Sequence, residues 1–282
     1  MVTIKNEFLT AKINERGAEL KSLSCNGKEY IWYGDPKYWA SSAPHLFPIC
    51  GGLVDGEYIY DSKPYQMQKH GYVRFCDFEI ENKSRSCVTF IHKSSEETKK
   101  VFPFDYTLRI NFSLVGKTLS VLYSIDNDSE KDMYFSIGPH EGFLCPDGIE
   151  NYDILFDDKQ TLYATELDGD VLSDKKQLIV DNSNILPLKY NYFDKDALVF
   201  KNIEFNSLSL INKKTKEGLK LDFSGHSYLV LWSKQNAPYI CIEPWHGIHD
   251  TLGFNKDFKN KEGIQKLEKN SRYFLSHNIE VL

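Results

Sequence analysis

The stretch TLRINFSLVGKTLSVLYSI, residues 107–125, carries the alternation that decides how this chain folds. Apolar residues occupy every second position before the central VGK, and the same spacing resumes after it. Because successive side chains of a β-strand point to opposite faces, the pattern predicts two strands, each with one buried face. The short polar VGK segment is typical of a hairpin turn. The alternating apolar residues are Leu108, Ile110, Phe112, Leu114, Leu119, Val121, Tyr123 and Ile125.

The same alternation recurs toward both ends of the chain. Residues 9–13 (LTAKI) and 272–282 (RYFLSHNIEVL) each predict a strand. Residues 75–92 predict a strand, a polar turn and a second strand. Asn26-Gly27 is the strongest short-range signal for a two-residue hairpin, and apolar and aromatic residues follow it directly.

Helical periodicity is confined to residues 95–102 and 254–270, where we expect only short helices. No linker rich in proline, glycine or serine divides the chain, and no internal repeat is present. We therefore expect one domain over residues 1–282, of the all-β class. The architecture predicted is a large antiparallel β-sandwich with few short helices and with its chemistry on loops and strand ends.

The composition argues against some classes of binding partner and against a membrane location. The formal net charge of -6 argues against nucleic acid, because nothing would neutralise a row of phosphates. The N-terminus lacks the features of a signal peptide, and no apolar run approaches the roughly 20 residues of a membrane span. The six cysteines show no C-x-x-C pair, so we expect reduced thiols. These features predict a cytoplasmic protein that acts without a membrane, as a monomer or homodimer.

The segment CIEPWHGIHD, residues 241–250, is the densest in reactive side chains. Glu243 follows the apolar residues YICI, so we expect its carboxyl to be partly desolvated, with a raised pKa. Pro244 is expected to stop the strand ladder there. His246, His249 and Asp250 could bind a metal, but their histidine spacing suits only a helix, which Gly247 disfavours. We therefore predict no metal site.

Two other histidines lie on glycine-flanked turns. His140 lies in SIGPHEGF, after an apolar strand, and His70 lies in QKHGYVRF between Lys69 and Arg74. Either could be a site residue or an ordinary turn histidine. We assign His92, His226 and His277 structural or solvent-facing roles, since no acid-rich context surrounds them.

The sequence lacks the signatures of several other chemistries. It contains no G-x-S-x-G elbow and no glycine-rich phosphate loop. The remaining candidates are two histidines and a few acids at separate strand ends. One of these acids, Asp196, precedes the apolar run ALVF. Imidazole and a carboxyl with a raised pKa are suited to general acid–base catalysis near neutral pH. The ligand predicted is polar and hydroxylated.

The order of these motifs resembles the aldose 1-epimerase (galactose mutarotase) family, in its LacX-like branch. The resemblance runs from ERGAELKSL through HGYVR, SIGPHEGF and DALVF to CIEPWHGIHD, which is nearly the whole chain. It implies a supersandwich fold, which agrees with the strand pattern. It also implies interconversion of the α and β anomers of a free sugar, with no cofactor or metal.

The resemblance also implies roles for single residues. Glu243 matches the carboxylate that takes the proton from the anomeric hydroxyl, and His140 matches the histidine that protonates the ring oxygen. His70 matches a second histidine that hydrogen-bonds the sugar, and Asp196 matches the acid that holds sugar hydroxyls. Aromatic residues such as Trp245 and Tyr72 could stack on a pyranose or belong to the core.

Three features depart from the family pattern. Many members carry an arginine that contacts the sugar where this chain has Gly52. Glu141 follows His140 directly, and a carboxylate beside that imidazole would raise its pKa. Lys69 and Arg74 bracket His70. Basic residues near this region hold the phosphate in the related hexose-6-phosphate branch, so the resemblance implies that a phosphorylated sugar is a possible substrate.

We expect a mutarotase that acts on an aldohexose or its phosphate. The alternative is a non-catalytic carbohydrate-binding or sensing protein with the same pocket, which the missing arginine favours. A glycosidase or polysaccharide lyase ranks lower, because glycoside hydrolysis needs two carboxylates about 5–10 Å apart.

Overall fold

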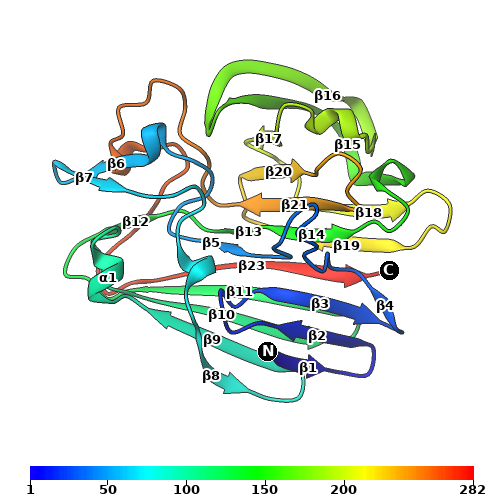
Figure 1. Cartoon of the computed structure of the whole chain (residues 1–282), viewed down its shortest axis with the longest axis horizontal. Coiled ribbons are helices and arrows are strands. Elements are labelled where there is room, and N and C mark those ends of the chain that lie inside the picture. Colours follow the sequence, from blue (N-terminus) through cyan, green and yellow to red (C-terminus); the bar gives the residue numbers. More distant parts are fainter.

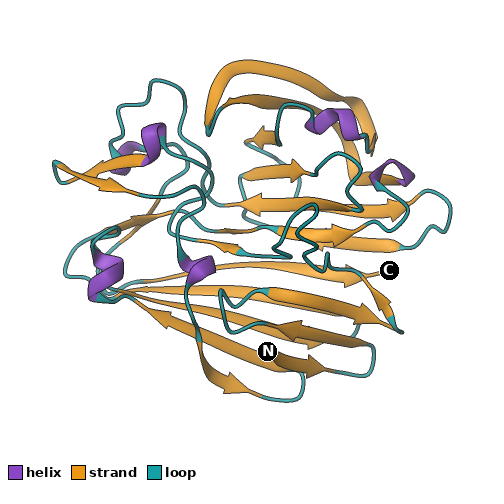
Figure 2. Cartoon of the chain, in the orientation of Figure 1, coloured by secondary structure: helices purple, strands orange, loops and turns teal.

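The computed structural model describes all residues 1–282 and is built almost entirely of antiparallel strands (Figure 1, Figure 2). The fold is therefore all-β, as predicted. The largest unit is a 13-stranded sheet, in which the twelve strands of the main path are hydrogen-bonded side by side. In spatial order these are β14 (Glu141–Leu144), β21 (Tyr239–Trp245), β20 (Tyr228–Trp232), β17 (Leu198–Lys201), β15 (Tyr152–Asp168), β18 (Ser207–Asn212), β19 (Gly218–Asp222), β23 (Arg272–Val281), β11 (Thr118–Asn127), β10 (Tyr106–Val115), β9 (Cys87–Lys93) and β8 (Glu79–Lys83).

The thirteenth strand of the large sheet and four smaller sheets complete the fold. Strand β16 (Val171–Pro187) pairs only with β15, and this long hairpin arches over the top of the molecule in Figure 1. A four-stranded sheet lies in front of β9 and β10 and contacts them. Its strands are β1 (Val2–Lys5), β2 (Leu9–Ile13), β3 (Leu20–Cys25) and β4 (Lys28–Glu29). The two-stranded sheets are β12 (Met133–Phe135) with β22 (Gln265–Leu267), β13 (Gly138–Pro139) with β5 (His45–Leu46), and β6 (Glu57–Tyr60) with β7 (Lys63–Gln66).

The hairpin predicted at residues 107–125 is present as β10 and β11. Leu108 pairs with Ile125 and Val115 with Thr118, while Gly116 takes a positive φ in the turn. The apolar residues of its alternating pattern are buried, as predicted. The strands predicted at residues 9–13, 75–92 and 272–282 and the hairpin at Asn26-Gly27 are also confirmed.

Helices are few and short (Figure 2). The one α-helix, α1 (Glu96–Lys99), lies in the segment predicted to be helical, and a capping box between Ser95 and Thr98 starts it. In residues 254–270, where short helices were also predicted, the structure has one 3₁₀ turn and the strand β22. The 3₁₀ turns are η1 (Val54–Gly56), η2 (Val73–Phe75), η3 (Ile149–Asn151), η4 (Tyr190–Phe193) and η5 (Phe258–Asn260). None of these helical segments has the length and apolar character that crossing a bilayer would require.

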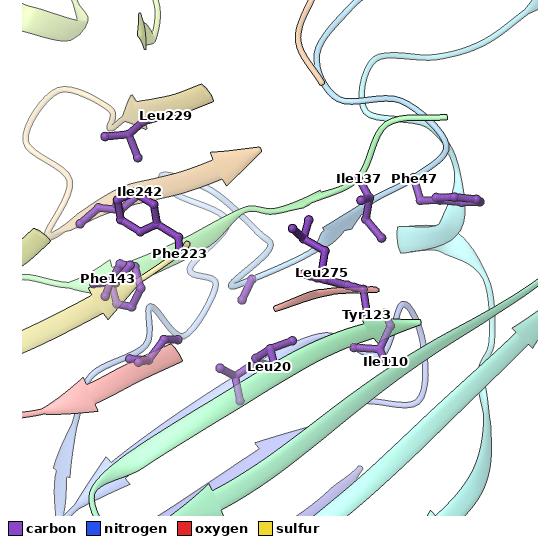
Figure 3. Close-up of a cluster of buried hydrophobic side chains, with 14 of the residues drawn as sticks. Leu20, Phe47, Ile110, Tyr123, Ile137, Phe143, Phe223, Leu229, Ile242 and Leu275 are labelled. Atoms are coloured by element: carbon purple, nitrogen blue, oxygen red, sulfur yellow. The ribbon is translucent and has the colours of Figure 1, made fainter. Parts of the chain in front are cut away.

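One large apolar core contains residues of both the four-stranded sheet and the 13-stranded sheet. Figure 3 shows Ile242 and Phe143 of β21 and β14 in the same cluster as Leu20 of β3 and Tyr123 of β11. Every residue of β21 is buried, and β14 and β20 pair with its backbone on both sides. Polar side chains on this strand are therefore held in a dry and rigid setting.

Candidate active site

A cavity of about 370 Å³ opens above β21. All seven residues that the sequence and the family resemblance indicated line it: Lys69, His70, Arg74, His140, Asp196, Glu243 and Trp245. The remaining lining residues are Trp39, Leu167, Ala197, Val230, Trp232 and His249. The fold thus brings together side chains that are up to 210 positions apart, from Trp39 to His249.

The strand register places His140 opposite Glu243. Ile137 bridges to His246 and Glu141 pairs with Ile242, so the same register sets position 140 against position 243. The Nδ1 atom of His140 lies 3.4 Å from Oε2 of Glu243. Side chains at such non-hydrogen-bonded pairs approach closely, and this explains the contact.

Pro244 does not end its strand, so this prediction was wrong. Strand β21 continues to Trp245, and Pro244 pairs with Leu229 of β20. The register toward β14 instead sets Pro139 opposite Pro244, and neither residue has an N–H to donate. The two prolines interrupt the ladder only on that side, next to the His140–Glu243 pair.

Burial shifts the protonation of this pair toward its neutral forms. Glu243 is 1% exposed, and desolvation, with a further contribution from the charge of Glu141, raises the pKa of its carboxyl well above 4.5. Desolvation lowers the pKa of His140 to about 3. Neither Nδ1 of His140 nor Oε2 of Glu243 has a hydrogen-bond partner. Both pKa shifts thus favour the neutral carboxyl of Glu243 and the neutral imidazole of His140.

Glu141 does not face His140, and the expectation that it would raise the pKa of that imidazole was wrong. Adjacent residues of a strand point to opposite faces, so Glu141 enters the sandwich core. There its Oε1 lies 2.7 Å from Nε2 of His277, and both side chains are buried. His277 is accordingly a buried partner of this glutamate and not a solvent-facing residue.

His70 lies beside this pair, at right angles to His140, with ring centroids 5.4 Å apart. Its Nδ1 accepts a hydrogen bond of 3.1 Å from the N–H of Gly51, so the neutral ring carries its proton on Nε2. Its backbone has φ of 69°, and Gly71 packs so closely on Phe47 that a Cβ there would lie 2.1 Å from the carbonyl oxygen. The chain bend that holds His70 thus depends on glycine at position 71.

The tip of the β15–β16 hairpin forms one wall of the site. Asp170 of this tip pairs with Lys69, with Oδ1 and Nζ 2.9 Å apart, and its carbonyl oxygen lies 2.8 Å from Nδ1 of His249. A Cβ atom at Gly52 would lie 2.4 Å from that carbonyl oxygen. The hairpin tip therefore fills the space beside position 52, and a larger side chain there would have to displace it.

Arg74 is the cationic side chain of the cavity that no carboxylate neutralises. Its guanidinium donates one hydrogen bond of 3.0 Å to the carbonyl of Lys69, and its Nε is buried without a partner. Asp196, on the other side, accepts a bond from the N–H of Ala197 through Oδ1. A donor and an acceptor are thus both available to a polyhydroxylated ligand.

Several residues of the cavity were missed by sequence reasoning. Trp39 stacks on His140 with ring centroids 4.9 Å apart and an angle of 27°, and Trp232 meets the same imidazole edge-on. His249, which the sequence analysis considered only as a metal ligand, also lines the cavity. Tyr72 bonds Tyr106 and lies outside the cavity. No local pattern marks these tryptophans, because topology alone brings them to the site.

The alternative metal site in residues 246–250 is not formed. His246 contacts the hydroxyl of Tyr273, whereas His249 contacts Gly52 and Asp170. Asp250 forms a buried ion pair of 2.8 Å with Lys261. The three side chains therefore point to different partners.

Comparison with known proteins bears on the family and the fold of the chain. Residues 1–270 match the family model described as aldose 1-epimerase. The chain is 30% identical to the chromosomal protein LacX of Lactococcus lactis subsp. lactis, over 100% of this chain and 99% of the relative. A galactose mutarotase-like protein from Lactobacillus casei superposes with a TM-score of 0.94 at 33% identity, over the full length of both chains. A galactose mutarotase related enzyme from Lactobacillus acidophilus gives 0.93 at 30% identity, over 100% of this chain and 97% of that one.

Proposed function

The chain belongs to the aldose 1-epimerase family, and from this premise we propose that it interconverts the α and β anomers of an aldohexose or hexose phosphate. The observation that carries the proposal is the buried pair of His140 and Glu243, 3.4 Å apart at the floor of the cavity. A cytoplasmic location and a monomeric or homodimeric state stay predictions from sequence.

The reaction removes one proton from the anomeric hydroxyl of the sugar and adds one proton to its ring oxygen. Glu243 takes the proton from the anomeric hydroxyl while His140 donates a proton to the ring oxygen, and the ring opens to the aldehyde. The aldehyde then rotates about its bond to C2, and the two transfers reverse to close the ring as the other anomer. Such paired general catalysis is worth about 10²–10⁴ in rate.

The burial of the pair suits this cycle. Ring opening starts from a carboxylate and an imidazolium, and it ends with a neutral carboxyl and a neutral imidazole. Desolvation favours these neutral forms, as the directions of the two pKa shifts indicate. The site therefore stabilises the enzyme state that accompanies the open-chain sugar, which is the least stable form of the substrate.

The other cavity residues supply binding. His70 donates from Nε2 to a hydroxyl near the reacting oxygens, and Asp196 accepts from sugar hydroxyls. Trp39, Trp232 and Trp245 provide aromatic walls for the apolar faces of a pyranose. Arg74 and Lys69 are the cations available to a phosphate, although Asp170 already pairs with Lys69.

Polarimetry tests the proposal. Fresh α-D-glucose, α-D-galactose and glucose 6-phosphate relax slowly in buffer, and the protein is expected to accelerate at least one of them. Glu243→Gln and His140→Asn should remove the acceleration. If the wild-type protein binds a sugar without accelerating any relaxation, it is a carbohydrate-binding protein and the proposal is wrong.

A further inference from the structure

Cys241 lies next to the acid–base pair on the same face of β21. It is two residues before Glu243, so its side chain points in the same direction. The residue opposite it on β14 is Gly142, and Trp32 and Trp39 occupy the space that a side chain there would take. Nδ1 of His140, Sγ of Cys241 and a carboxylate oxygen of Glu243 all lie within 4.8 Å of one another.

Two of these donor atoms lack any partner. Nδ1 of His140 and Oε2 of Glu243 are buried without a hydrogen bond, and the thiol of Cys241 is fully buried. Unpaired buried polar atoms are costly, so a group that satisfied them together would be held strongly. Nothing else in the molecule places an imidazole, a thiol and a carboxylate so close together.

We propose that His140, Cys241 and Glu243 form an inhibitory binding site for a zinc ion. One nitrogen, one sulfur and one oxygen donor form a set that Zn²⁺ accepts, and three protein ligands with an open fourth position are usual at accessible zinc sites. The fourth position faces the cavity, where water or a sugar hydroxyl completes the tetrahedron.

The geometry needs only a small adjustment. Tetrahedral zinc with bonds of about 2.0–2.3 Å holds its ligand atoms roughly 3.3–3.8 Å apart. The His140–Glu243 separation of 3.4 Å already fits that range. A rotation of the Cys241 side chain toward the pair would bring Sγ into the same range. On binding, the thiol of Cys241 and the carboxyl of Glu243, where it is protonated, each lose a proton to solvent as the metal bonds form, and no electrons are transferred.

Zinc at this position would stop the reaction, and this consequence rests on the proposed function. The metal would occupy the lone pairs of both the base and the acid, so neither could exchange a proton with the sugar. Metal binding itself does not depend on turnover. A spectroscopic test of binding therefore separates failure of this inference from failure of the proposed function.

Cobalt(II) is the probe, because it substitutes for zinc and its bond to a thiolate absorbs in the near ultraviolet. Titration of the metal-free protein with Co²⁺ should give this band with one equivalent, together with the intense visible bands of tetrahedral cobalt. Cys241→Ala should lose the thiolate band. Cys145→Ala, which removes another fully buried thiol, should keep it.

Inhibition is then measured with Zn²⁺, each variant being compared with its own metal-free rate. The zinc concentration for half inhibition should rise at least tenfold in Cys241→Ala and stay unchanged in Cys145→Ala, and a chelator should restore the wild-type rate. The inference is overturned if the wild type gives no thiolate band, or if Cys241→Ala keeps the band or its full sensitivity to zinc. A band that is present in a protein without mutarotase activity would leave the zinc site standing and contradict the proposed function.

Discussion

His140 and Glu243 are cross-strand neighbours whose side chains meet 3.4 Å apart in a buried setting, with no other hydrogen-bond partner for the two facing atoms. A single register across β14 and β21 produces this contact, and two opposed prolines interrupt the ladder beside it. The site therefore holds an acid and a base at close range in a buried setting.

Glu243→Gln is expected to stabilise the protein while removing its activity. The folded-state pKa of Glu243 is raised above 4.5, so its contribution to stability is present below that pH and is lost as pH rises through the folded pKa. A neutral glutamine avoids the cost of a buried charge. Chemical denaturation at pH 8 should show a gain of about 1–2 kcal/mol in the free energy of unfolding.

The pH series provides the control for this stability prediction. The gain from Glu243→Gln should shrink toward zero as pH falls to about 4, because the wild-type carboxyl is then protonated as well. A gain that did not change with pH, or a loss of stability at pH 8, would show that Glu243 is not held at a raised pKa.

The pH dependence of kcat/KM should have its acid limb far below neutrality. Desolvation lowers the pKa of His140 to about 3, so this imidazole takes up an additional proton only in strong acid. An ordinary histidine would give an acid limb near pH 6.5. Buffer-corrected rates should therefore stay constant from about pH 7 down to about pH 5, and a tenfold loss over that range would contradict the account.

Asp170→Asn should favour phosphorylated sugars by freeing Lys69. The Lys69–Asp170 pair is partly exposed, so a modest effect is expected, about 1.5- to 5-fold in KM for glucose 6-phosphate. KM for neutral sugars should stay within twofold. Asp168→Asn, at the same hairpin tip but without an ion pair, serves as the matched control. An equal response of both variants, or none, would remove Lys69 from the phosphate-binding residues.

Lys261→Met should destabilise the protein by about 3–5 kcal/mol, because it leaves the buried carboxylate of Asp250 unpaired. The double variant Asp250→Asn/Lys261→Met keeps an oxygen for the N–H of Val54, which Asp250 accepts at 2.9 Å. The double variant should therefore recover part of the lost stability in thermal and chemical denaturation. A double variant less stable than Lys261→Met would show that the ion pair is not the source of the effect.

Strands could be predicted from sequence wherever one face is buried, as in residues 107–125, because the two-residue period is visible without any alignment. The role of Glu243 could also be predicted from sequence, since an acid directly after the apolar residues YICI lies on a strand that carries its carboxylate into the interior. The same alternation directs Glu141 away from His140 and toward His277, which is why the predicted effect of its charge on His140 was wrong.

The other residues of the site depend on contacts between segments that are distant in the sequence. Trp39 and Trp232 carry no local mark of a site, and only the folded sheet stacks them around His140. Asp170 belongs to an exposed hairpin turn, and its effect on Lys69 and Gly52 arises where that turn docks. Such pairings are set by topology, which the period of a single strand does not encode.

The central claim is that Glu243 and His140 together open and close a sugar ring. Exchange NMR on a sugar at anomeric equilibrium tests it most directly, because the cross-peak between the two anomeric protons measures the α–β exchange rate. The wild-type protein is predicted to raise this rate above that of buffer, and both Glu243→Gln and His140→Asn should return it to the buffer value. Exchange at the buffer rate with wild-type protein that visibly binds the sugar, or full exchange with either variant, would contradict the claim.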